Sequence, residues 1–290
     1  MSFSLPRSIW GALIALFVCA ASLVMIEISA IPKDRKLAPG MTVVGRITDP
    51  RIAESSGVVA SRLHPGVFWT HNDGGGTKRQ VLYAINREGK LLADFNVAGA
   101  KIVDWEDIAL DDAGHLYIGD IGNNYADRQE IAVYEIDEPD PKSLHSAVNI
   151  NRSWKLHFPK HPFDCEALFV WKSHGYVISK VLNNKNAEIF RFPLEHTTVP
   201  VTLDKVARLP VESPVTGADI SLDGRRLGIV CHAGAYIFEI NGKAGRTDEA
   251  PYRRAKYRND YIEGCCFVPE GLLATAESRE ILLFSESAFQ

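Results

Sequence analysis

The sequence is poor in cysteine and carries no excess of positive charge. Its 290 residues include only five cysteines, too few for a disulfide-built scaffold. The 32 Lys and Arg residues are outnumbered by 36 Asp and Glu residues, which gives a net charge of −4 and argues against nucleic-acid binding. The G-x-S-x-G, P-loop and H-E-x-x-H patterns are absent. A hydrophobic content of 46% rules out global disorder.

One N-terminal run is apolar enough to cross a membrane. Ser8 to Ile26 is 19 residues long without a charge, close to the ~20 residues that a spanning helix needs. We expect a tail over residues 1–7, an uncleaved anchor over 8–31 and a polar linker over 32–40. A cleaved signal sequence and a core helix are the alternatives. Basic residues flank both ends, so charge sets no orientation. A single span before one long domain favours a periplasmic or extracellular domain, membrane-tethered or secreted after cleavage.

Residues 41–290 contain five copies of one weakly conserved unit. Each copy begins with a short apolar strand and continues through a turn that ends in glycine. The strand segments are ESSGVVA, EDIALDD, EALFVWK, TGADISL and EGCCFVP, starting at residues 54, 106, 166, 216 and 263. The turn glycines are separated by 48, 61, 49 and 47 residues. Units of ~40–50 residues with several strands are typical of propeller blades.

Further strands complete the expected blades. A second strand follows each glycine, a third carries alternating aromatic and β-branched residues, and four units show a more polar fourth strand. The last unit ends before its fourth strand, and Met41 to Thr48 is a strand without a unit. We therefore predict an all-β, single five-bladed β-propeller closed by its N-terminal strand. Six blades would require a cryptic unit in the 61-residue spacing, and a β-sandwich is the other alternative.

The repeat layout predicts an acidic mouth. The first strand of each blade lies innermost, so its first residues and the end of the second strand meet at one end of the channel. The carboxylates expected there are those of Glu54, Asp104, Glu106, Glu166, Asp219 and Glu263, with Asp164 beside them. The ends of the second strands add His71, Asn72, Asp73, Asp120, Asn123, Asn124, Lys180, His232 and Glu277.

Two interpretations of these carboxylates stay open. In the first they bind a ligand or a hard cation such as Ca²⁺, with Glu54, Asp73, Glu106 and Asp120 as metal ligands. In the second they accept N–H bonds from the neighbouring blade and only lock the ring. Cys165, Cys231 and the Cys265–Cys266 pair are expected to fill the core, with one disulfide after export as the alternative.

Three segments resemble a group of uncharacterised bacterial propeller-like proteins. ESSG at residues 54–57, DWED at 104–107 and GDIGNN at 119–124 are similar to the E-S-S-G, D-W-E-D and G-D-I-G-D-N patterns of that group. Asn123 replaces an Asp of the pattern, which removes one charge from a cation site. A more distant similarity of layout is to extracytoplasmic propellers that include calcium-dependent, phytase-like phosphatases. That similarity implies fold alone.

These observations favour a binding module. The acidic mouth would hold a small molecule, a glycan or a protein partner, residues 8–31 would contact the membrane, and calcium is the candidate ion. The alternative is a metal-dependent hydrolase of phosphate or ester substrates, in which Lys180 and His232 would steady an anionic transition state. A phosphatase should gather several Lys or Arg residues at the mouth, and the sequence places only Lys180 and Arg279 there.

Overall fold

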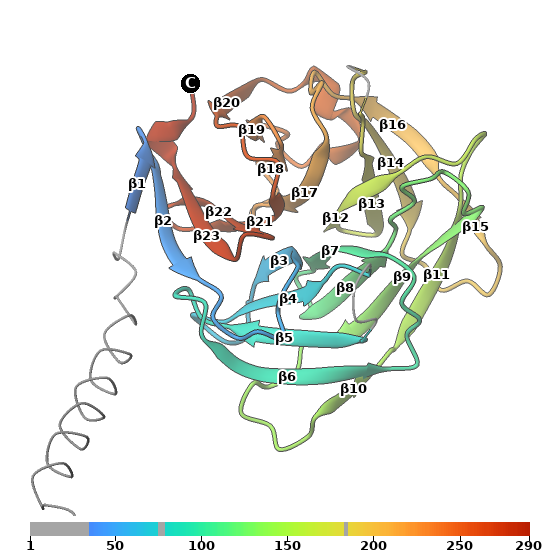
Figure 1. Cartoon of the computed structure of the whole chain (residues 1–290). Coiled ribbons are helices and arrows are strands. Elements are labelled where there is room, and N and C mark those ends of the chain that lie inside the picture. The colour runs from blue at the N-terminus through green and yellow to red at the C-terminus, as the bar shows by residue number, and fades with distance from the viewer. Residues whose placement is uncertain (1–34, 75–78, 183–184) are drawn as a thin grey trace, which may run out of the picture. The chain divides into compact units, whose positions relative to one another are not determined.

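The computed structural model describes residues 35–74, 79–182 and 185–290, which form five sheets around a central axis (Figure 1). The inner strands are β3 (Ser55–Ala60), β7 (Trp105–Leu110), β12 (Cys165–Trp171), β17 (Val215–Ile220) and β21 (Ile262–Val268). The second strands are β4 (Phe68–Asn72), β8 (His115–Asp120), β13 (His174–Ser179), β18 (Leu227–Cys231) and β22 (Gly271–Ala276). Each pair is antiparallel, so the starts of the inner strands and the ends of the second strands share one face.

The outer strands complete the blades. The third strands are β5 (Val81–Ile85), β9 (Glu130–Asp137), β14 (Glu188–Pro193), β19 (Gly234–Phe238) and β23 (Glu280–Ser285). The fourth strands are β6 (Leu91–Ala98), β11 (Arg152–His157), β16 (Asp204–Arg208), β20 (Tyr252–Lys256) and, for the last blade, β2 (Met41–Arg46). Two 3₁₀ helices, η1 (Ala244–Glu249) and η2 (Glu286–Ala288), follow β19 and β23.

The N-terminal strand closes the ring, as predicted. β2 pairs antiparallel with β23, so the first described part of the chain completes the sheet that the last part begins. The all-β, five-bladed prediction is confirmed. β1 (Arg35–Ala38), inside the segment expected to be linker, adds a fifth strand to this sheet by pairing with β2. Gly40 turns the chain between the two strands with φ of +73°, which a residue with a Cβ rarely adopts.

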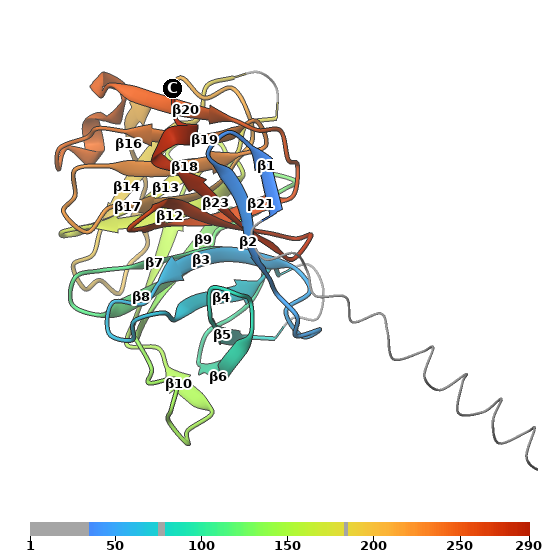
Figure 2. The ribbon, with the colours of Figure 1, turned by 90° about the vertical axis from the view of Figure 1, so that its left-hand side faces the viewer.

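The long spacing between the second and third blades contains no sixth blade. Between β9 and β11 the chain leaves its own sheet and forms β10 (Ala147–Asn149), which pairs in parallel with β6 of the first blade. Figures 1 and 2 show β10 at the outer edge beside β6. In the same way β15 (Val201–Thr202), from the third blade, pairs in parallel with β11 of the second. These excursions fasten neighbouring blades together and cover sheet edges.

Apolar side chains fill the spaces between neighbouring sheets. Trp69 and Trp105 are fully buried in one such cluster, so both belong to the core. The four cysteines of the described residues are buried and free, as the core interpretation predicted. Cys265 and Cys266 point to opposite faces of β21 and enter different clusters.

No helix among the described residues is long and apolar enough to cross a membrane. The anchor or signal sequence predicted over residues 8–31 lies outside the described residues.

Candidate cation site at the channel mouth

A register shift at the start of every inner strand builds the mouth. The pairing of each inner strand with its neighbour slips within the first residues of the strand. Such a bulge leaves a residue unpaired and redirects its side chain. The bulge of β3 contains Ser56 and Gly57, and the other four contain Glu106, Glu166, Thr216 and Glu263. Five sheets therefore bring three glutamates and two hydroxyls to one rim.

Around this rim lies a small acidic cavity of about 120 Å³, which we call the cup. Its lining includes all three bulge glutamates. The full lining is Glu54, Ser56, Asp73, Glu106, Asn124, Glu166, Lys180, Glu263 and Glu277. Among the described residues, six carboxyl groups thus share the space with a single amine, so the carboxyl groups of the cup repel one another when charged.

Three carboxylates of the first two blades come close enough to hold one ion. Asp73 follows β4, Asp104 precedes β7, and Glu106 occupies the bulge of β7. An oxygen atom from each lies within 4.8 Å of the other two. Gly122 makes this approach possible, because a Cβ there would lie 2.2 Å from Glu106 Oε1 and 2.4 Å from Asp104 Oδ2.

The cup also contains a buried acceptor that lacks a hydrogen bond. Glu166 is 4% exposed, and Lys180 Nζ donates to its Oε1. Its Oε2 is buried and has no hydrogen-bond partner among the described residues. A buried carboxylate oxygen without a donor is costly. A bound cation or its water ligands would satisfy this atom.

Burial and mutual repulsion raise the pKa values of the cup carboxyls. Burial followed by repulsion from Asp73 raises the pKa of Asp104 to about 6. Burial followed by repulsion from Glu166 raises the pKa of Glu263 to about 9 and that of Glu106 well above its usual range. Burial alone would lower the pKa of Lys180, but the Glu166 carboxylate outweighs it and raises that pKa. A cation would reverse the carboxyl shifts, because it favours the charged forms.

Other side chains lock the blades together. Ser56 Oγ donates to the Glu106 carbonyl at 2.5 Å, and Thr216 Oγ1 donates to the Ile262 carbonyl at 2.6 Å. Fully buried Asp107 Oδ2 accepts the N–H groups of Leu168 at 2.8 Å and Ala218 at 3.1 Å.

One carboxylate thus ties β7 to both β12 and β17. By contrast, no backbone N–H of the described residues donates to the Glu106, Glu166 or Glu263 carboxylates. The interpretation in which these glutamates only lock the ring therefore lacks the hydrogen bonds that it requires.

Asp219 does not reach the mouth, which corrects its expected position. Thr216 occupies the bulge of β17, and Asp219 lies three residues further along, about 10 Å at the rise of a strand. Its half-buried carboxylate accepts the Phe267 N–H at 2.8 Å. It lines a second cavity of about 620 Å³ where β3, β17 and β21 end. Burial raises its pKa to about 6.

Several predicted residues support the mouth without lining the cup. His71 is fully buried against Trp105, and burial lowers its pKa. Asn72 Oδ1 accepts the Glu54 N–H and Asn72 Nδ2 donates to the Arg51 carbonyl.

Asp120, expected as a metal ligand, is 2% exposed and not in the group of three. It accepts the Asp104 N–H at 2.8 Å and the Arg128 guanidinium at 3.1 Å. Asn123 donates its N–H to Asp164. Its side chain donates to the Arg128 carbonyl and accepts the Arg128 N–H. The sequence predicted Asp120 as a metal ligand, whereas the observed group of three contains Asp104 in its place. Glu54, also predicted as a ligand, lines the cup beside this group.

His232 belongs to a different cavity. It lies in a cleft of about 660 Å³, where its Nδ1 is 3.9 Å from Asp260 Oδ1. Burial and the charge of Lys180 lower its pKa. Of the two candidate catalytic residues, only Lys180 therefore lines the cup.

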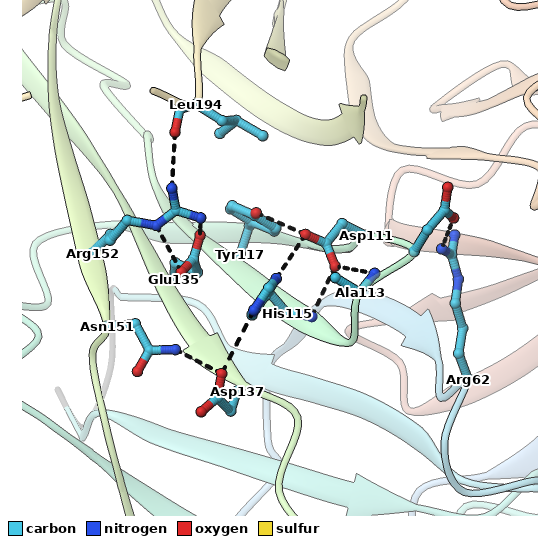
Figure 3. A network of polar contacts seen from close by, with 11 residues as sticks. Arg62, Asp111, Ala113, His115, Tyr117, Glu135, Asp137, Asn151, Arg152 and Leu194 are labelled. Atoms are coloured by element: carbon cyan, nitrogen blue, oxygen red, sulfur yellow. Dashed lines mark hydrogen bonds and ion pairs between the residues drawn. The ribbon is translucent and has the colours of Figure 1, made fainter. Parts of the chain in front are cut away.

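A polar network that the sequence did not indicate lies at the other end of the second blade (Figure 3). Asp111 accepts hydrogen bonds from Tyr117 Oη at 2.9 Å and from the His115 backbone at 2.9 Å, and pairs with His115 Nδ1. The Asp111 hydrogen bond raises the pKa of His115. These contacts hold the turn between β7 and β8, away from the mouth.

Comparison with known proteins gives no family. No family model matches the chain, and no curated protein matches it. A chain in the crystal structure of a nidogen/laminin complex is similar at 11% identity and a TM-score of 0.48, over 77% of this chain and 72% of that one. The Dos1 propeller is similar at 11% identity and a TM-score of 0.40, over 77% of this chain and 53% of that one. Neither likeness bears on the site.

Proposed function

We propose that this propeller is a binding module whose mouth holds a divalent cation. The observation that carries the proposal is the convergence of Asp73, Asp104 and Glu106 within 4.8 Å, in a cup where no described residue donates a hydrogen bond to Glu166 Oε2. The ion would balance the charge of the cup. It would also leave coordination positions open toward solvent for an oxygen-bearing ligand.

The size of the cup favours an ion over a larger ligand. A volume of about 120 Å³ corresponds to roughly four water molecules at ~30 Å³ each. An ion with a few waters fits there, whereas a glycan or a protein segment would have to bind at the rim above it.

The ligand chemistry favours Ca²⁺. Carboxylate oxygens select Mg²⁺, Ca²⁺ or Mn²⁺ over softer metals. Mg²⁺ demands near-ideal octahedral geometry, whereas Ca²⁺ accepts six to eight oxygens in irregular arrangements. Here the ligands come from the end of one strand, the connection before another and a bulge, and such a set suits the more tolerant ion.

The test is thermal unfolding of the full chain in mild detergent with CaCl₂, MgCl₂, MnCl₂ or a chelator. An ion at 100 times its Kd stabilises the native state by ~2.7 kcal/mol, which at ~2–4 °C per kcal/mol raises Tm by about 5–10 °C. Glu106→Gln should abolish the Ca²⁺ shift, because it removes a charged ligand at the centre of the group.

The matched control is Glu195→Gln, since Glu195 is exposed and lies outside the cup. This variant should keep the full shift. No shift of the wild-type protein with any of the three ions would refute the cation site, and an equal shift in Glu106→Gln would refute its location.

A metal-dependent hydrolase is the second candidate, favoured by the amine of Lys180 in the cup. That amine is already paired with Glu166, and His232 lies in the other cavity. Lys180 and His232, the two residues predicted to stabilise an anionic transition state, therefore do not share one site. Hydrolysis of p-nitrophenyl phosphate or acetate that requires Ca²⁺ and is lost in Glu106→Gln would establish the enzyme.

We also propose that residues 8–31 tether the propeller to the membrane on its outer side. The support is the length of the uncharged run. The full chain should stay with membranes after alkaline carbonate extraction and keep its N-terminus by mass spectrometry. External protease should digest the propeller in intact cells or spheroplasts. Release by carbonate, or an N-terminus beyond residue 31, would refute the anchor.

A further inference from the structure

A second cavity on the mouth side has the opposite charge. It is the cleft of about 660 Å³ that contains His232, and we call it the basic cleft. Its lining comes from the third and fourth blades and includes Glu212, His232, Tyr236, Arg254, Lys256 and Arg258. The volume falls within the ~300–1,000 Å³ range of small-molecule sites.

Strand alternation places two cations on one side of this cleft. Arg254 and Lys256 lie two residues apart on β20, Arg258 lies two residues beyond its end, and all three are exposed. Side chains two residues apart in a strand point the same way, at steps of about 6.8 Å. Arg254 and Lys256 form no ion pair within the described residues, while Arg258 lies 3.4 Å from Asp260.

The neighbouring strand shows which face of the blade carries the cations of β20. Gly234 of β19 lies opposite Lys256, and Tyr236 lies opposite Arg254. Residues directly opposite in an antiparallel pair share a face. Tyr236 belongs to the apolar cluster between the third and fourth blades. Arg254 and Lys256 therefore lie on the face of the fourth blade that is turned toward the third.

The charged groups of the cleft are mostly cationic. Among the described residues, Arg254, Lys256 and Arg258 line it together with one carboxylate, Glu212, and Asp260 lies beside Arg258 and His232. Spaced cations that exceed the local carboxylates attract a multiply charged anion, and Arg guanidinium matches phosphate geometry. The volume of the cleft exceeds that of a phosphate ion, which leaves room for an organic part.

We propose that the basic cleft binds a phosphorylated small molecule of the size of a sugar phosphate. The phosphate contacts Arg254 and Lys256, and the organic part occupies the rest of the cleft. This site is independent of the cation proposed for the cup, because no described residue lines both cavities.

The test is calorimetric titration of the full chain in detergent with glucose 6-phosphate, in the presence of a chelator so that the cup plays no part. Glucose, which lacks the phosphate, should not bind. Arg254→Gln and Lys256→Gln should each weaken glucose 6-phosphate binding about tenfold, the effect of removing one charge-assisted hydrogen bond. The control Lys90→Gln removes an exposed positive charge from the first blade and should change nothing.

Three results would overturn the proposal. They are no binding of glucose 6-phosphate, equal binding of glucose, and unchanged affinity in both β20 variants. Citrate that binds as tightly as glucose 6-phosphate would refute the assignment to phosphate. If glucose 6-phosphate does not bind but Ca²⁺ still raises the Tm of Lys256→Gln, the proposal for the basic cleft fails while the cation site in the cup is retained.

Discussion

Gly122→Ala should weaken the cation site although it replaces none of the proposed ligands. The new Cβ would lie 2.2 Å from Glu106 Oε1 and 2.4 Å from Asp104 Oδ2. An ordinary contact begins near 3.4 Å, so the two carboxylates must retreat by about 1.2 and 1.0 Å. Both oxygens are the far ends of side chains, and Gly122 does not have a positive φ, so the backbone can stay in place. The fold should survive while the group of three is pushed apart.

The expected loss follows from the role of such supporting positions. Changes next to metal ligands cost ~10–100-fold in affinity. At a Ca²⁺ concentration of 100 times the wild-type Kd, a 100-fold loss reduces the stabilisation from ~2.7 to ~0.4 kcal/mol. The Ca²⁺-induced rise in Tm should therefore shrink from about 5–10 °C to about 1 °C.

The assay is calorimetric titration with Ca²⁺, supported by melting curves with Ca²⁺ and with chelator. The control is Gly245→Ala, where the new Cβ would meet its nearest neighbour, Val206 Cβ, at an ordinary 3.7 Å. Wild-type Ca²⁺ affinity in Gly122→Ala would refute the reasoning, because the ion could then not lie between Asp104 and Glu106.

Two further predictions concern stability. Burial raises the pKa of Asp219 to about 6 from 3.8, so the folded state holds a proton that the unfolded state loses, and stability should fall as pH rises from about 4 through 6. This pKa shift lowers the free energy of unfolding by up to ~3 kcal/mol at high pH. In urea titrations, Asp219→Asn should therefore be more stable than wild type at pH 8 but not at pH 4. An equal difference in stability at the two pH values would contradict the shift. Asp107→Ala should cost about 3–5 kcal/mol by urea titration, because it strands the buried N–H groups of Leu168 and Ala218; a loss below 1 kcal/mol would show that Asp107 does not tie the blades.

The repeat pattern sufficed to predict the blades and the closing strand. Glycine turns and alternating third strands are local signals, and they recur often enough to fix the architecture. They also brought Glu106, Glu166, Glu263 and Lys180 to one face, because the start of an inner strand and the end of its neighbour must meet. Pairing with another blade leaves no such local signal, so β10 and β15 were not predicted.

The sequence analysis misplaced mouth residues where a shift of one residue in strand register decides their position. A bulge adds a single residue and has no clear sequence signature, so Asp219 was aligned by its charge although Thr216 holds the equivalent position. Asp104 and Asp120 lie on facing segments, and only the folded connection shows that Asp104 joins Asp73 and Glu106 in the group of three. The polar character of β20 was visible in the sequence, but its cations could not be assigned to a cavity between two blades.

Asp107 joins three blades of the propeller through one side chain. Its carboxylate reaches from the second blade to the third and fourth, and it is wholly shielded from solvent. The positions of β7, β12 and β17 are therefore coupled, so a change that moves one of these inner strands should displace the other two.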